Sequence, residues 1–184
     1  MAAQRLRPVI LPALAGLAAA IGCGGGTGPS AHPTPPFAAV SAGGLHTCGL
    51  TAAGVAYCWG YNGFGQLGDG TTTDRSTPVL VAAPAGVSFA AVSAGLRHTC
   101  GLTAAGVAYC WGYNGFGQLG DGTTTNRSSP VLVVGGVSFA AVSAGWRHTC
   151  GVTAAGAAYC WGDNTSGQLG DGTTTQRLTP VRVQ

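Results

Sequence analysis

Three near-copies of one unit of about 50 residues fill most of this 184-residue chain. The segment FAAVSAG begins at Phe37, Phe89 and Phe139, so the copies start 52 and 50 residues apart. Between His46–Val81 and His98–Val133, only two of 36 positions differ. Repeats of this length indicate an array of small supersecondary units, because each unit must bury its apolar face against the next.

Each copy is predicted to form four short β-strands. FAAVSAG is typical of an inner strand, HTCGLT and VAYCWG flank a turn with the composition AAG, and PVLV begins with a proline that suits an edge strand. With 33 glycines and 7% charged residues, the composition favours short strands joined by tight turns. The sequence therefore predicts an all-β fold of three four-stranded antiparallel repeats. We place these repeats at residues 37–88, 89–138 and 139–184.

Two cysteines recur at one spacing in every copy. If residues 52–54 form the hairpin loop, Cys48 stands directly opposite Cys58. Opposed residues at a non-hydrogen-bonded position have Cα atoms about 4.5 Å apart, which a disulfide can bridge. The alternative is a metal site that uses His46 with both cysteines, but zinc sites usually place cysteines two to four residues apart. The expected disulfides are Cys48–Cys58, Cys100–Cys110 and Cys150–Cys160.

The N-terminus has the features of a secretory leader. MAAQRLRP carries two positive charges, and the apolar stretch VILPALAGLAAAIG follows it. We expect residues 1–22 to be a lipoprotein-type signal peptide, Cys23 to be lipidated, and residues 23–36 to form a Gly/Pro-rich tether. Lipidation of Cys23 would leave six of the seven cysteines for three pairs. The motif departs from a bacterial lipobox at Ala20, where leucine is preferred, so ordinary cleavage beside an incidental cysteine is the alternative. Either interpretation predicts a protein of the bacterial cell envelope or a secreted one, with a membrane anchor only if Cys23 carries lipid.

One loop motif imitates a nucleotide site. GFGQLG, from Gly63 to Gly68, matches the glycine fingerprint of dinucleotide-binding loops. That fingerprint requires a strand before it and a helix after it. Here the poor helix former DGTTT follows, and the third copy reads TSGQLG. The sequence therefore indicates no nucleotide cofactor, and we predict no other cofactor or metal.

Charged side chains are too few and too regularly placed for an active site or a nucleic-acid surface. Beyond the leader there are six arginines, five aspartates and no lysine or glutamate, without a basic stripe. Three aspartates share one position in GDGTTT and are typical of turns: Asp69, Asp121 and Asp171. Three histidines also share one position, which favours a repeated architectural hydrogen bond: His46, His98 and His148. We predict neither an enzyme nor a nucleic-acid-binding protein.

The motifs SAGLRHTCGLT, GVAYCWG and NGFGQLGDG closely resemble the repeat of the regulator of chromosome condensation family. The resemblance covers Phe37 to Gln184. It implies a β-propeller with four-stranded blades, typically seven of them. Three blades cannot close a ring, because propellers have roughly four to eight. We therefore expect a truncated gene product, a ring that a homo-oligomer completes, or an incomplete ring held by a partner.

In such a propeller the loops of successive blades gather on one rim. Aromatic side chains held on rigid loops are frequent binding hot spots. The candidate rim residues are Tyr61, Phe64, Tyr113, Phe116 and Trp146. Asn62 and Asn114 would lie beside them. In the alternative interpretation, Phe64 and Trp59 pack between blades instead.

The resemblance implies several functions. Some eukaryotic members exchange guanine nucleotides on a small GTPase and bind chromatin, and at least one secreted bacterial relative inhibits β-lactamases. The leader and the lack of a basic surface argue against a nuclear role. We therefore predict an envelope-anchored scaffold, structural or bound to a protein partner that the sequence does not identify. The alternative function is that of a guanine-nucleotide exchange factor.

Overall fold

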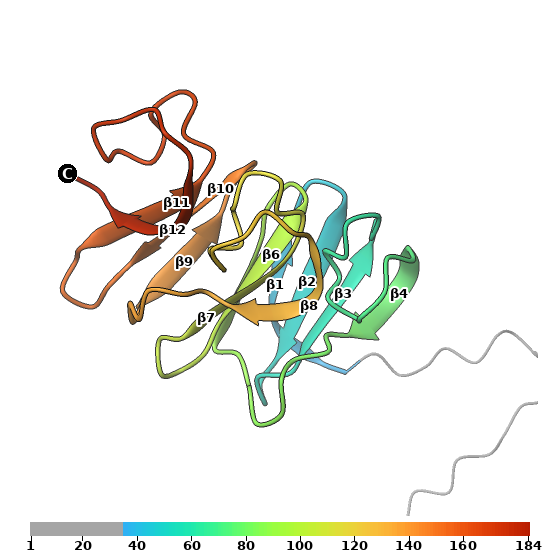
Figure 1. Ribbon diagram of the computed structural model, residues 1–184. Helices are drawn as coiled ribbons and strands as arrows, with labels where there is room; N and C mark the ends of the chain where they lie inside the picture. The colour runs from blue at the N-terminus through green and yellow to red at the C-terminus, as the bar shows by residue number, and fades with distance from the viewer. Residues whose placement is uncertain (1–34) are drawn as a thin grey trace, which may run out of the picture. The chain divides into compact units, whose positions relative to one another are not determined.

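The computed structural model describes residues 35–184, and Figure 1 shows that this part of the chain is built from three successive β-sheets. The first sheet consists of β1 (Phe37–Ala42), β2 (His46–Thr51), β3 (Ala56–Gly60) and β4 (Arg75–Leu80). The second consists of β5 (Ala91–Ala94), β6 (His98–Leu102), β7 (Ala108–Gly112) and β8 (Arg127–Leu132). The third consists of β9 (Ala141–Ala144), β10 (His148–Val152), β11 (Ala158–Gly162) and β12 (Arg177–Arg182).

Each sheet pairs its four strands in chain order and antiparallel, which confirms the predicted all-β class of three four-stranded repeats. In residues 35–184 there is no helix with the length and hydropathy that a membrane span requires. The predicted signal peptide, Cys23 and nearly all of the tether lie outside the described residues.

The hairpin between β2 and β3 sets the register of the whole sheet. The amide of Thr51 donates to the carbonyl of Val55 at 3.0 Å, and Gly54 closes the turn with a φ of 77°. Only glycine adopts this left-handed conformation without strain. Counting back along both strands brings Cys48 opposite Cys58.

The outer strand differs from its prediction. The sequence suggested a strand that begins at Pro78, whereas β4 begins at Arg75 and contains the proline within it. Because β4 is the edge of the sheet, the missing N–H of proline can be tolerated there. A register shift in β3 between Cys58 and Gly60 bends the strand pair and brings Gly60 opposite Arg75.

The hydrophobic core lies between the sheets, in two equivalent interfaces. The first interface joins the first and second sheets, and its buried residues are Cys48, Leu50, Ala56, Cys58, Leu67, Val81, Phe89 and Trp111. The second interface joins the second and third sheets in the same way, with Cys100, Leu102, Ala108, Cys110, Leu119, Val133, Phe139 and Trp161. In both, one phenylalanine and one tryptophan of the following sheet pack onto the preceding sheet. Each repeat is therefore stabilised by its neighbour, as expected for a repeat array.

Candidate functional site

A fully buried asparagine organises the long loop of each repeat. The Asn62 side-chain amide donates to the carbonyls of Thr71 and Thr73 at 3.1 and 3.0 Å, and to Asp69 at 3.2 Å. Its oxygen accepts a hydrogen bond from the amide of Leu67 at 2.9 Å. The loop thus closes around one polar side chain whose hydrogen-bonding groups are all paired, which holds the loop rigid.

The prediction that Asn62 and Asn114 lie on the rim is therefore wrong. Both side chains are fully buried beneath it, because the loop folds back over them. The third repeat has the same arrangement around Asn164, whose amide donates to the carbonyls of Thr173 and Thr175.

The aspartate of GDGTTT belongs to the same loop frame. Arg75 holds Asp69 through its Nη2 atom at 2.8 Å, and both the hydroxyl and the amide of Thr71 donate to the carboxylate. Burial acts to raise the pKa of Asp69, but the hydrogen bonds from Thr71 and Arg75 outweigh it and hold the pKa below its ordinary value. The carboxylate is thus engaged as a loop brace. The equivalent pairs are Arg127–Asp121 at 2.9 Å and Arg177–Asp171 at 2.7 Å.

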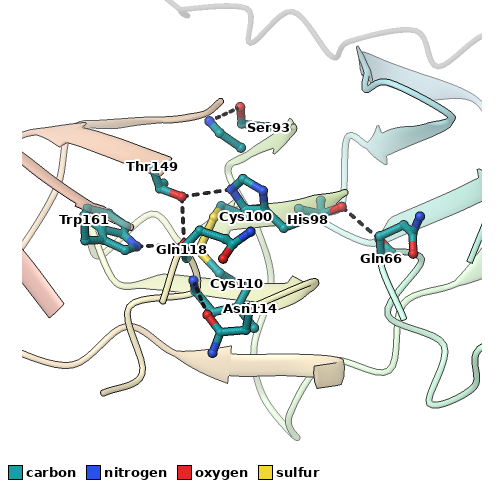
Figure 2. The surroundings of a disulfide bond; sticks show 12 residues. Gln66, Ser93, His98, Cys100, Cys110, Asn114, Gln118, Thr149 and Trp161 are labelled. Carbon is teal, nitrogen blue, oxygen red and sulfur yellow. Dashed lines mark hydrogen bonds between the residues drawn. A yellow bond between two sulfur atoms is a disulfide. The ribbon is translucent and has the colours of Figure 1, made fainter. Parts of the chain in front are cut away.

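A buried hydrogen-bond relay crosses each interface, as Figure 2 shows for the second one. Thr149 donates its hydroxyl proton to the carbonyl of Gln118 at 2.8 Å, and the Trp161 indole donates to the same carbonyl at 2.9 Å. His98 Nε2 lies 2.9 Å from the Thr149 hydroxyl. Because that hydroxyl already donates its proton, Nε2 must carry the hydrogen, and the ring is the neutral Nε2–H tautomer.

The first interface repeats this relay with His46, Thr99, Gln66 and Trp111. His46 Nε2 lies 2.8 Å from the Thr99 hydroxyl, which donates to the Gln66 carbonyl at 2.8 Å. Burial lowers the pKa of His46 to about 4. Burial also lowers the pKa of His98 to about 3, with a smaller contribution from charge repulsion by the other repeated histidines. Both rings are neutral at physiological pH, and because both are buried, neither is accessible to a substrate as a general base.

Each of the three hairpins contains a disulfide, and the disulfides of the first two sheets belong to the core clusters of the two interfaces. They join Cys48 to Cys58, Cys100 to Cys110 and Cys150 to Cys160, each with Cα atoms 4.1 Å apart. Within residues 35–184, no group of three or more His, Cys, Asp or Glu side chains is placed to hold a metal ion.

Above this frame, aromatic side chains of successive loops meet edge to face. Tyr61 and Phe64 have ring centroids 6.1 Å apart, and Phe64 reaches across the interface to Tyr113 at 4.9 Å. Tyr113 in turn lies 6.2 Å from Phe116. The structure therefore brings four of the predicted rim residues into one row that spans two repeats.

Two arginines that sequence reasoning did not select complete this row. Arg97 lies over the ring of Phe64 at 5.1 Å. Arg147 lies over Phe116 at 4.7 Å and over Trp146 at 5.3 Å, which links the exposed Trp146 to the row. We call the combined surface the rim strip, and it consists of Tyr61, Phe64, Arg97, Tyr113, Phe116, Trp146 and Arg147.

The sequence marks the positions of these arginines by variation between the copies, but it does not show which rings they contact. They stand directly before the repeated histidine, at a pair of positions where the three copies differ. The pairs are Gly44–Leu45, Leu96–Arg97 and Trp146–Arg147. Around the last two pairs the strip forms a shallow hollow of about 120 Å³ that Tyr113 also lines.

Comparison with known proteins agrees with this architecture. The model of the regulator of chromosome condensation (RCC1) repeat matches residues 53–102, 105–152 and 155–184. A second model of the same repeat matches residues 37–66, 89–118 and 139–168.

Among curated proteins, the chain is similar to the ultraviolet-B receptor UVR8 of Arabidopsis thaliana, with 39% identity over 94 residues. It is also similar to the probable E3 ubiquitin-protein ligase HERC4 of Homo sapiens, with 40% identity over 95 residues. Each match covers 51% of this chain, but only 21% of the plant receptor and 9% of the human ligase. The chain thus matches a small part of these relatives.

Solved structures show the same fold. Yeast RCC1 (Prp20) bound to Kap60 superposes with a TM-score of 0.70 and 25% identity, over 80% of this chain and 37% of that one. Human WBSCR16 gives a TM-score of 0.73 at 23% identity, over 80% of this chain and 38% of that one, and supports the fold alone. The repeat models, the three four-stranded sheets and these structures together show that the chain belongs to the regulator of chromosome condensation (RCC1) repeat family.

Proposed function

We propose that this protein is an exported, envelope-anchored scaffold that binds a partner protein through the rim strip. The observation that carries the proposal is the continuous row of aromatic and arginine side chains across three repeats. Aromatic residues and arginine are the residue types most enriched at binding hot spots. The row is supported by loops that close around buried asparagines, so little conformational entropy would be lost on binding.

The charges of the rim strip indicate the chemistry of the partner. Within residues 35–184, Arg75, Arg127 and Arg177 are engaged in ion pairs, whereas Arg97 and Arg147 take part in none. Both of these arginines lie exposed on the strip. A partner segment that combines acidic and apolar side chains would match this surface, because it would pair with the guanidinium groups and cover the rings.

Trp146 is the most exposed aromatic residue of the strip. Its side chain is 64% exposed, whereas the tryptophans of the two interfaces are fully buried. A large aromatic ring exposed beside two unpaired cations is typical of a recognition surface. We infer that Trp146 is the principal anchor for the partner.

Export to the envelope is the second part of the proposal. Three hairpin disulfides favour an oxidising compartment, because cytosolic proteins keep their thiols reduced. The leader sequence and Cys23 suggest an anchored mature form. Intact-mass analysis of the protein from its native host should find a diacylglyceryl-modified Cys23 as the first residue. A different mature start, or an unmodified Cys23, would contradict the anchor.

Binding can be tested by site-specific photo-crosslinking from position 146 in native envelopes, followed by affinity measurement with the purified partner. We expect Trp146→Ala and Phe116→Ala each to weaken binding about tenfold or more, which corresponds to at least about 1.4 kcal/mol. Leu132→Ala is the matched control, since Leu132 is 46% exposed but lies on the edge strand β8. Equal losses for rim and control variants would contradict the rim as the binding surface.

The exchange-factor function belongs to a different class and has its own test. Among the solved relatives, yeast RCC1 (Prp20) has been seen bound to Kap60, and Prp20p binds Gsp1p and histones. The present chain spans only 37–38% of the yeast RCC1 (Prp20) chain in these two structures. We propose a non-catalytic binder, which should leave guanine-nucleotide release from a small GTPase unchanged. Accelerated release by the purified chain would favour the exchange factor instead.

A further inference from the structure

The first and third sheets lie at opposite ends of the array, and each presents one face without a neighbouring sheet among residues 35–184 (Figure 1). We call the free face of the first sheet the leading face. Its residues include Phe37, Thr47 and Trp59. We call the free face of the third sheet the trailing face. Its partly exposed residues include His148, Cys150, Val152 and Gln168.

The leading face carries the same phenylalanine–tryptophan pair that packs into the interfaces elsewhere in the molecule. In the second interface, Phe139 and Trp161 insert together with their ring centroids 5.7 Å apart. On the leading face, Phe37 and Trp59 occupy the equivalent positions, also 5.7 Å apart. The phenylalanine ring lies over Gly49, where a Cβ atom would come within 2.7 Å of it. The aromatic pair is therefore pre-positioned for insertion.

The trailing face has the corresponding apolar hollow. It measures about 220 Å³ and its lining includes Val142, Cys150, Val152 and Ala158. Cys48 and Cys100, which precede the filled interfaces, are fully buried, whereas Cys150 is partly exposed. The exposure of Cys150 shows where the phenylalanine and tryptophan of a further repeat would pack.

The polar groups of the two faces are complementary as well. In each filled interface a histidine and a glutamine carbonyl of one sheet pair with a threonine and a tryptophan of the next. The trailing face supplies the first set, His148 and Gln168. The leading face supplies the second set, Thr47 and Trp59. All four are partly exposed, whereas their equivalents Thr99 and Trp111 are fully buried.

The third repeat keeps an apolar trailing face while its loop has become more polar. Asp163 and Ser166 replace the tyrosine and phenylalanine that the other copies carry on the rim strip. The Cys150–Cys160 disulfide of the trailing face remains as in those copies, and Val152 replaces their leucine with another apolar residue. Surfaces that face only water have no physical need to stay apolar, so the apolar trailing face favours an occupant built like a repeat of this chain.

We propose that the leading face of one molecule binds the trailing face of a second copy of this chain, and that two copies joined at both pairs of faces close a ring of six sheets. The contact is heterologous, because two different surfaces meet. Each new interface would contain the aromatic insertion and the histidine–threonine relay of the internal interfaces. The proposal is independent of the rim strip, which remains free in such a ring.

Native mass spectrometry and light scattering of the disulfide-intact chain at micromolar concentration test the proposal. The wild-type protein should have twice the mass of one chain. Trp59→Asp on the leading face and Val152→Asp on the trailing face should each yield monomers, because a charge would be buried at both contacts. Leu132→Asp, on the exposed edge strand β8, is the matched control and should keep the double mass.

A mixing experiment separates loss of binding from loss of folding. Trp59→Asp leaves the trailing face intact, and Val152→Asp leaves the leading face intact. An equimolar mixture of Trp59→Asp and Val152→Asp should therefore form a one-to-one pair through a single interface, which requires both variants to be folded. A monomeric wild-type protein, species larger than two copies, or folded variants that do not pair on mixing would each overturn the six-sheet ring.

Discussion

Mild acid should destabilise this protein because two buried histidines are neutral in the folded chain. In the unfolded chain a histidine has the ordinary pKa of 6.5, whereas in the structure the pKa is about 4 for His46 and about 3 for His98. Between these values the unfolded state binds more protons than the folded state, so the free energy of unfolding falls as the pH falls. The stabilisation is fully present above about pH 6.5 and is lost progressively below it.

The magnitude follows from the shift. At about pH 5 the solution is about 1.5 units below the unfolded pKa, and each unit corresponds to about 1.4 kcal/mol. Each buried histidine thus contributes a loss of about 2 kcal/mol, and the two together lose about 4 kcal/mol. Because domains of ordinary stability have only about 5–15 kcal/mol, this is a large fraction. With a urea m-value of about 2 kcal/mol per M, the midpoint should fall by about 2 M.

Urea unfolding at about pH 7.5 and about pH 5, with disulfides intact, measures this loss. In His98→Gln the amide can still donate to Thr149 but does not titrate, so about half of the acid sensitivity should disappear. Asp74→Asn is the matched control, because the second copy already has Asn126 at that position, and it should keep the full sensitivity. Equal unfolding free energies at the two pH values, or an unchanged pH dependence in His98→Gln, would refute the reasoning.

Three further changes test the loop frame, the hairpins and the bulge. Asn114→Ala should lower the free energy of unfolding by about 2–4 kcal/mol, because several buried polar groups lose their hydrogen-bond partner. Asn126→Asp, which introduces the residue that the first copy has at Asp74, should change it by less than about 0.5 kcal/mol. Urea unfolding measures both. Replacing Cys100 and Cys110 together by alanine should cost about 2–3 kcal/mol for the loop it opens, and non-reducing peptide mapping of the wild type should find links only within repeats. Gly60→Ala should cost about 1–3 kcal/mol in thermal unfolding, since φ is 108° and a Cβ would lie 2.6 Å from the Leu45 carbonyl.

Strands and their register could be predicted because they depend on neighbours in the sequence. The glycine of the hairpin loop sets the turn, and counting from it brings Cys48 opposite Cys58. The histidine relay could not be predicted, since His46 pairs with Thr99 in the next repeat, 53 residues away. The same sequence pattern is compatible with many spatial partners until the sheets are placed against one another.

The candidate site, like the fold, could be predicted only in part. The aromatic row was predicted because propeller loops gather on one rim, but Asn62 was placed on that rim by mistake. Its side chain turns inward because the loop backbone offers two carbonyls and one amide that need partners. Arg97 and Arg147 were missed because a stacking contact depends on the ring of a neighbouring loop rather than on any local motif.

The residues that stabilise the fold differ from the residues that can select a partner. The relay and the asparagine-centred loops are the same in every filled interface, so they supply equal support wherever they occur. Just before the repeated histidine, by contrast, the copies carry Gly44–Leu45, Leu96–Arg97 and Trp146–Arg147. Of these residues, Arg97, Trp146 and Arg147 lie on the rim strip, and none of the six belongs to either core cluster. Changes at these positions can therefore alter charge and aromatic area on the rim with little cost in stability, which makes them the positions where partner choice should be decided.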